Sequence, residues 1–97
     1  MMRRAARIDA NQPSIVEALR VIGATVEPIY MVGGGVPDLL VGYRGVNWLI
    51  EVKDGDKPPS RRRLTPDEQA WHDDWRGQVA VVNDAQEAID VVCGGIE

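Results

Sequence analysis

Three charged side chains, Asp38, Glu51 and Lys53, lie in or beside stretches that otherwise consist of strand-forming residues. Charges are costly to bury in such stretches unless an opposite charge or a metal ion compensates them. Glu51 and Lys53 are two residues apart, and side chains alternate with a period of two along a strand. Both therefore point to one face, whereas Val52 points the other way, into a core. The spacing predicts a compact charged cluster.

The type and order of these residues predict a metal site. Asp38 precedes one expected strand, residues 39–43, and Glu51 lies near the end of the next, residues 48–53, so a hairpin brings the two carboxylates together. Two convergent carboxylates form a hard-oxygen site suited to Mg²⁺ or Mn²⁺. Such an ion polarises a phosphodiester and activates a water, and Lys53 can orient or deprotonate that water or stabilise charge on the phosphate. The plainer alternative is a salt-bridge cluster on the hairpin surface.

A basic run follows the expected hairpin. It comprises Arg61, Arg62 and Arg63, with Lys57 just upstream. Such a run is either a solvated loop or, in a nuclease, a loop that contacts phosphates. The glycines at 33–35 leave room for a bulky backbone to approach just ahead of Asp38. They match no phosphate-binding fingerprint, so the sequence does not support an NTPase.

Length and composition predict one small domain. The chain has 97 residues, so we expect one domain, at 11–97, and the residues MMRRAARIDA before it predict a flexible basic arm at 1–10. The net charge is −4. The core would be small, and a dimer would bury more surface. The acidic balance argues against a general nucleic-acid coat protein without excluding a nuclease. No apolar run approaches a membrane span, we expect no secretory signal because no apolar segment follows the basic residues of the N-terminus, and the single cysteine excludes an internal disulfide.

Periodicity and capping residues predict seven elements in the order α-β-β-β-α-β-α. Asn11 is the expected N-cap of the first helix, Pro28 marks the first strand as an edge or irregular strand, and Thr65 with Glu68 forms a capping box. Asn83 or Asp84 would cap the last helix. The expected ranges are a helix at 12–22, strands at 24–31, 39–43 and 48–53, a helix from 65 to near 77, a strand at 78–82, and a helix that ends at 94–95.

The motif Pro-Asp, twelve residues, then Glu-Val-Lys resembles the PD-(D/E)xK nuclease superfamily. The wider pattern GGGVPDLLVGYRG, WLIEVKDG and LTPDEQAWHDDWRGQVAVV resembles the stand-alone VRR-NUC (virus-type replication-repair nuclease) domains of phages and bacteria. The resemblance runs from about Asn11 to about Val92. It implies an α/β fold with a restriction-endonuclease-like core, a small mixed sheet flanked by helices. It also implies a homodimer, metal-dependent cleavage of DNA, often branched, and a cytoplasmic location in a bacterial cell or a phage-infected host.

The resemblance also implies roles for individual residues. Asp38 and Glu51 would hold the metal together with the main-chain carbonyl of Val52, and Lys53 would be catalytic. A glutamine on the following helix, matching Gln69, is characteristic of the family and would be catalytic, with an exposed helix residue as the plainer alternative. The family usually has a glutamate on its first helix, where this sequence has Gln12. We expect Gln12 to take that site position through its carbonyl or a water, which favours a site built mainly on the two carboxylates.

The remaining aromatic and histidine residues have plainer interpretations. His72 could act as a general base, although a helix-surface or interface position fits its sequence context better. Trp71 and Trp75 are four residues apart on one helix face and are expected core or dimer contacts, with base stacking as the alternative. Trp48 is expected in the core. We therefore predict a Mg²⁺- or Mn²⁺-dependent DNA endonuclease. The alternatives are a nuclease-like module that binds DNA structure or a protein without cutting, and a purely structural dimeric domain.

Overall fold

A computed structural model describes residues 8–94 of the chain, so most of the expected basic arm, residues 1–7, lies outside the described residues. The order of helices and strands agrees with the expected one. Two short 3₁₀ helices, Tyr30–Val32 and Pro59–Arg61, are added to it. The elements are α1 (Gln12–Val21), β1 (Thr25–Pro28), β2 (Leu39–Tyr43), β3 (Val46–Val52), α2 (Pro66–Asp74), β4 (Val79–Val82) and α3 (Ala85–Gly94).

The four strands form one mixed sheet in the order β1-β2-β3-β4. β1 pairs antiparallel with β2, β2 pairs antiparallel with β3, and β3 pairs parallel with β4. The parallel pair requires a crossover, and the segment that carries α2 supplies it. A mixed sheet flanked by helices confirms the predicted fold class. β1 lies at an edge of the sheet, which is where a strand containing Pro28 is tolerated.

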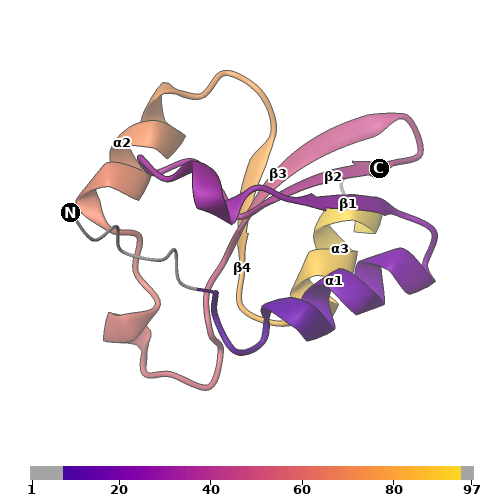
Figure 1. The fold of residues 1–97 in the computed structure, drawn as a ribbon, viewed down its shortest axis with the longest axis horizontal. Helices are drawn as coiled ribbons and strands as arrows, with labels where there is room; N and C mark the ends of the chain where they lie inside the picture. Colours follow the sequence, from indigo (N-terminus) through magenta and orange to yellow (C-terminus); the bar gives the residue numbers. More distant parts are fainter. Residues whose placement is uncertain (1–7, 95–97) are drawn as a thin grey trace.

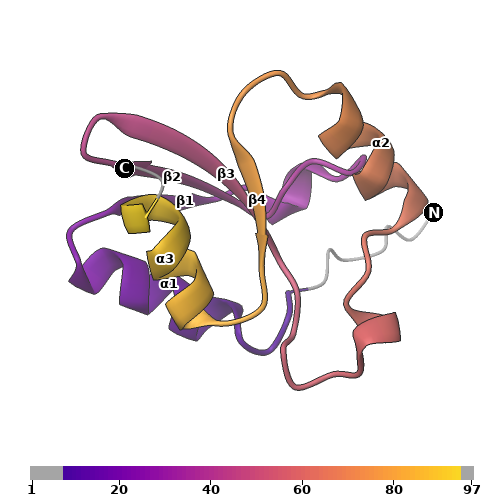
Figure 2. The ribbon, with the colours of Figure 1, turned by 180° about the vertical axis from the view of Figure 1, so that it is seen from behind.

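Helices α1 and α3 cover one face of the sheet and bury its core. Figure 1 shows the two helices side by side beneath the strands, and Figure 2 shows α3 in front of α1 from behind. The core residues alternate along the strands, as a half-covered sheet requires. They are Ile15, Leu19, Ala24, Val26, Leu39, Val41, Ile50, Val52, Val82, Ala88 and Val92. Trp48 packs against this cluster, as expected.

Helix α2 stands apart from this core. It lies at the other end of the molecule from α1 and α3 (Figure 1), and none of its residues is buried. Trp71 and Trp75 stack on each other with ring centroids 4.7 Å apart, and Trp75 is exposed. The expectation that they are core residues is therefore wrong, whereas a dimer contact stays a prediction. No helix in the described part of the chain is long and apolar enough to cross a membrane.

Several element boundaries differ from the expected ones. The first strand ends at Pro28 rather than Met31, because the chain turns into a 3₁₀ helix there. The hairpin turn is only Arg44 and Gly45, both with positive φ, so β3 already begins at Val46. Such two-residue turns match the twist of the flanking strands. Helix α2 ends at Asp74, short of Gly77, because the backbone of the next residue is extended.

Candidate functional site

The hairpin brings Asp38 and Glu51 together, as predicted. Leu39 pairs with Ile50, so the preceding aspartate and the following glutamate lie opposite each other on the face away from α1 and α3. The main chain fixes the aspartate at both ends. Its N–H donates to the Ile50 carbonyl at 3.1 Å, and its Oδ2 accepts from the Val52 N–H at 2.8 Å. The aspartate therefore has one defined orientation beside the glutamate.

The Glu51 carboxyl is buried against a second negative charge. Only 3% of the residue is exposed, and its Oε1 meets no hydrogen-bond donor among the described residues. Burial, and then the negative charges of Asp38 and Glu68, raise the pKa of Glu51 from 4.5 to about 9. Burial also raises the pKa of Asp38, although the hydrogen bond from Val52 opposes the shift. Asp38 disfavours ionisation of Glu51, whereas a hydrogen bond with Glu51 lowers the pKa of Asp38, so the pair shares one proton that a cation can replace.

Lys53 lies between two carboxylates. Its Nζ is 3.8 Å from Glu51 Oε2 and 2.8 Å from Glu68 Oε1. Burial alone would lower the pKa of the ammonium group, but the hydrogen bond to Glu68 and the charges of Glu68 and Glu51 outweigh it and raise the pKa. Burial acts against the ionised form of Glu68 too, but the hydrogen bonds from Lys53 and Thr65 lower its pKa overall. Both groups are therefore charged at neutral pH.

Helix α2 contributes Glu68 to the site, and not Gln69. The Gln69 side chain is exposed and donates from Nε2 to Asp73 Oδ1 at 2.9 Å, on the helix itself. A catalytic role for Gln69 stays a prediction that its placement does not support. Sequence reasoning identified Glu68 only as the partner of Thr65 in the capping box. The box is present, and the same Oε1 that accepts from the Thr65 N–H also accepts from Lys53.

Gly35 sets the position of the first turn of α2. This residue has a φ of +89°, and a Cβ atom there would overlap the main-chain carbonyl of Asp67. Only glycine lets the two backbones approach so closely. The backbone that approaches at Gly35 is therefore that of the protein's own helix α2, whereas a Cβ at Gly33 or Gly34 would meet no atom within 4 Å. This contact brings Glu68 to the end of the hairpin where Lys53 emerges.

The start of α1 is fastened to the same end of the sheet by Asn11. Its Nδ2 donates to the carbonyls of Lys53 at 3.0 Å and Asn83 at 2.9 Å, which are the residues that follow β3 and β4. Asn11 occupies the N-cap position but makes no side-chain cap bond, so its expected capping role is wrong. The amide instead donates hydrogen bonds to the two carbonyls that follow the strands. Its neighbour Gln12 is buried, with 4% of its surface exposed.

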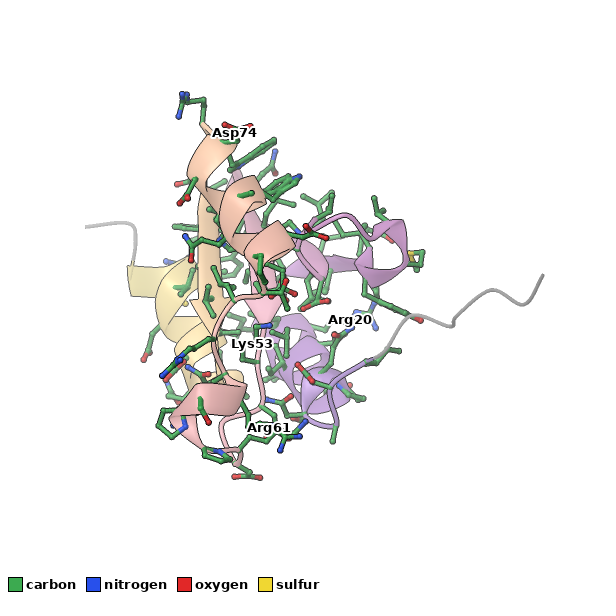
Figure 3. All side chains as sticks on the ribbon, turned by 90° about the vertical axis from the view of Figure 1, so that its left-hand side faces the viewer. Arg20, Lys53, Arg61 and Asp74 are labelled. Atoms are coloured by element: carbon green, nitrogen blue, oxygen red, sulfur yellow. The ribbon has the colours of Figure 1, made fainter. Side chains whose placement is uncertain are left out.

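Arg61 of the basic run lies on the same side of the molecule as Lys53. Figure 3 shows Lys53 in the middle of one face, with Arg61 below it at the end of the 3₁₀ helix Pro59–Arg61. Lys57, Arg61 and Arg63 are exposed, whereas Arg62 is half-buried. His72 is half-buried one turn along α2 from Glu68, and burial lowers its pKa. It is not a freely exposed surface residue, and a catalytic role stays untested.

The donor set fits a hard divalent cation. No three His, Cys, Asp or Glu side chains within residues 8–94 are grouped so as to hold a metal ion. The two carboxylates would therefore need oxygen ligands from the main chain or from water, which Mg²⁺ and Mn²⁺ accept readily. The Val52 backbone suits this, because its N–H faces Asp38 and the carbonyl of a strand residue points to the same side as its N–H.

Comparisons with known proteins identify a structural relative. A solved structure described as "VRR_NUC domain" is 30% identical in sequence and superposes with a TM-score of 0.62. The match covers 84% of this chain and 88% of that chain. No protein-family model matches the sequence, and neither does any curated protein.

Proposed function

The chain belongs to the VRR-NUC family, and from this premise we propose that it is a metal-dependent endonuclease that hydrolyses DNA phosphodiester bonds. The observation that carries the proposal is the buried carboxyl of Glu51 beside Asp38. Glu51 Oε1 lacks a donor among the described residues, and the negative charge of Asp38 disfavours ionisation of Glu51 unless a cation is present. A purely structural salt-bridge cluster would instead pair each carboxylate with its own cation.

Asp38, Glu51 and the main-chain carbonyl of Val52 would hold one Mg²⁺ or Mn²⁺ ion. A bound ion of this kind polarises the phosphodiester and lowers the pKa of a coordinated water. The protein's own contribution is to fix the two carboxylates in advance. The hydrogen bond from Val52 N–H to Asp38 and the burial of Glu51 limit the freedom of both side chains. Gln12, buried at the start of α1, is proposed as a further polar contributor at this end of the sheet.

Lys53 acts as a positive charge rather than as a base in this proposal. Its raised pKa keeps the ammonium protonated at neutral pH, so it can donate to a phosphate oxygen and stabilise negative charge that develops there. It would not accept the proton of the attacking water. Of the roles considered for this lysine, the ion pair with Glu68 at 2.8 Å favours charge stabilisation.

The basic loop would contact the DNA backbone. Lys57 and Arg61–Arg63 lie in the segment between β3, which carries the candidate site, and α2. Figure 3 shows Arg61 on the same face as Lys53. Each phosphate that such side chains neutralise releases counterions, so binding should weaken steeply with salt. Because the chain as a whole carries a net charge of −4, attraction to DNA must come from local basic clusters such as this one.

A homodimer with preference for branched DNA completes the proposal. The sheet face opposite α1 and α3 carries Leu40, Leu49, Val79 and Val81, with Leu40 40% and Val81 38% exposed. Trp75 borders the same face, next to Leu40 and Leu49. A second copy seated here would cover apolar surface and bring a second active site to one substrate, as a four-way junction requires. Size-exclusion chromatography with light scattering, comparing wild type with Leu40→Glu, tests the interface.

A nicking assay tests the activity. Supercoiled plasmid and a synthetic four-way junction would be incubated with the wild-type protein in Mg²⁺, in Mn²⁺ and in EDTA. The variants are Asp38→Asn, Lys53→Ala and, as a charge-matched control at an exposed position outside the site, Arg76→Ala. We expect cutting only with metal, a loss of at least about 100-fold in Asp38→Asn and Lys53→Ala, and no change in Arg76→Ala.

Two results would contradict the proposal. Cutting that persists in EDTA would exclude a metal mechanism. Binding of the junction without cutting in any metal, by protein that is folded by circular dichroism, would instead support a nuclease-fold module that recognises DNA structure.

A further inference from the structure

We propose that Glu68 is a positioning residue of the active site, which holds the Lys53 ammonium group away from Glu51. The inference rests on the proposed function, in which Glu51 is a metal ligand and Lys53 a charge donor. Lys53 has two carboxylates within reach, and it is 1.0 Å closer to Glu68 than to Glu51, at 2.8 Å against 3.8 Å. The structure therefore assigns the ion pair of Lys53 to helix α2 and not to the strand that carries the metal ligand.

The need for such an anchor follows from the chemistry of lysine. Its ammonium sits on a flexible four-carbon stem, and it makes its strongest hydrogen bond with the nearest carboxylate. Without Glu68, that carboxylate would be Glu51, two residues away on the same face. Lys53 would then form an ion pair with the carboxylate that a divalent ion needs as a ligand. Its ammonium group would also no longer be available to donate to a phosphate. Glu68 prevents both effects.

Glu68 is well placed for this role because it is itself fixed. The Thr65 N–H donates to Glu68 Oε1 at 2.8 Å, and Thr65 Oγ1 accepts from the Glu68 N–H at 3.2 Å. The backbone of this turn is seated against Gly35. Only 19% of the Glu68 side chain is exposed, so solvent screens its charge little. A rigid acceptor reduces the number of conformations that the long lysine side chain can adopt.

Side-chain NMR measures the positioning directly, without metal or DNA. The chain contains only two lysines, Lys53 and the exposed Lys57, so the second serves as an internal reference. We expect the order parameter of the Lys53 ammonium axis to be near that of rigid groups, about 0.8, and that of Lys57 to be below about 0.6. In Glu68→Ala the Lys53 value should fall toward that of Lys57. Equal values for Lys53 in the two proteins would overturn the inference.

Kinetics separate positioning from a merely structural role. Glu68→Ala should lower kcat about 10- to 100-fold, as loss of a residue that orients an active-site group usually does, with KM for DNA within about twofold of wild type. Glu68→Gln keeps an acceptor for Thr65 and Lys53 but not the charge, so it should recover part of kcat. Asp67→Ala, which removes the neighbouring acid from the same turn, should leave kcat unchanged.

Two further outcomes decide between explanations. Thr65→Ala removes one half of the capping box and leaves the contact between Glu68 and Lys53. An equal loss of kcat in Thr65→Ala and Glu68→Ala would show that helix capping alone explains the effect, and would overturn the inference. If the wild-type protein cuts no DNA, the proposed function fails, and the NMR comparison still decides whether Glu68 holds Lys53.

Discussion

Replacement of Glu51 by glutamine should stabilise the metal-free protein at alkaline pH. The folded protein holds a proton on Glu51 up to a pKa of about 9, against an ordinary value of 4.5. Below pH 4.5 the carboxyl is protonated in both the folded and the unfolded chain, so its burial does not lower the free energy of unfolding. Between the two values the unfolded chain loses the proton while the folded chain keeps it. The free energy of unfolding therefore falls as the pH rises.

The size of the effect follows from the two pKa values. Their full difference corresponds to about 6 kcal/mol, at about 1.4 kcal/mol for each tenfold change in proton affinity. Water that reaches the edge of the site screens part of this penalty, and we take about 2 to 3 kcal/mol as the expected value. Glutamine has the same shape and no charge. Glu51→Gln should therefore match wild type at pH 5 and exceed it by about 2 to 3 kcal/mol at pH 8.5.

Urea unfolding in EDTA, followed by tryptophan fluorescence, measures this difference at both pH values. The control is Glu27→Gln, which neutralises an exposed carboxylate on β1 and should change little at either pH. Addition of Mn²⁺ should raise the stability of wild type at pH 8.5 and leave Glu51→Gln nearly unchanged, because a ligand that binds only the folded state stabilises it. Identical stabilities of Glu51→Gln and wild type at pH 8.5 in EDTA would refute the reasoning about the buried carboxylate.

Three further variants test the surroundings of the site. Asn11→Ala should lower stability in urea by about 1 to 3 kcal/mol, since two strand-end carbonyls lose their donor; an unchanged midpoint would mean that water replaces the amide. Gly35→Ala should cost more than about 2 kcal/mol and alter the fluorescence of the tryptophans on α2, because a Cβ overlaps the Asp67 carbonyl; a wild-type spectrum would contradict the close approach. Joint replacement of Arg61–Arg63 by alanine should reduce the slope of log affinity against log salt by about 0.9 for each lost phosphate contact, and an unchanged slope would exclude this loop as the DNA contact.

The sequence by itself determined the carboxylate pair and the lysine. Alternation along a strand and a short hairpin connection are local rules, and they sufficed to place Asp38 opposite Glu51 with Lys53 on the same face, although the expected turn was longer than the observed one. The capping box of Thr65 was readable for the same reason, because all its contacts lie within four residues. Local patterns also predicted the order of the elements, whereas the mixed sheet was expected from the family resemblance.

Other assignments depended on contacts between segments far apart in the chain. Asn11 Oδ1 could have capped its own helix, but Nδ2 donates to the carbonyls of Lys53 and Asn83, 42 and 72 residues away, and in this orientation Oδ1 makes no cap bond. No local pattern records those partners. Trp71 of α2 and Trp75 just after it look like core residues by spacing, yet they stack on each other outside the core, because α2 does not pack on the core.

The choice between Glu68 and Gln69 was decided by tertiary structure alone. Adjacent residues on a helix point about 100° apart, so only one of them can face a given neighbour. Which one does so depends on how the helix is rotated and where it sits, and the backbone contact at Gly35 sets both. The sequence determined that a helix begins at this point. The packing of that helix against a distant glycine decided which side chain reaches Lys53.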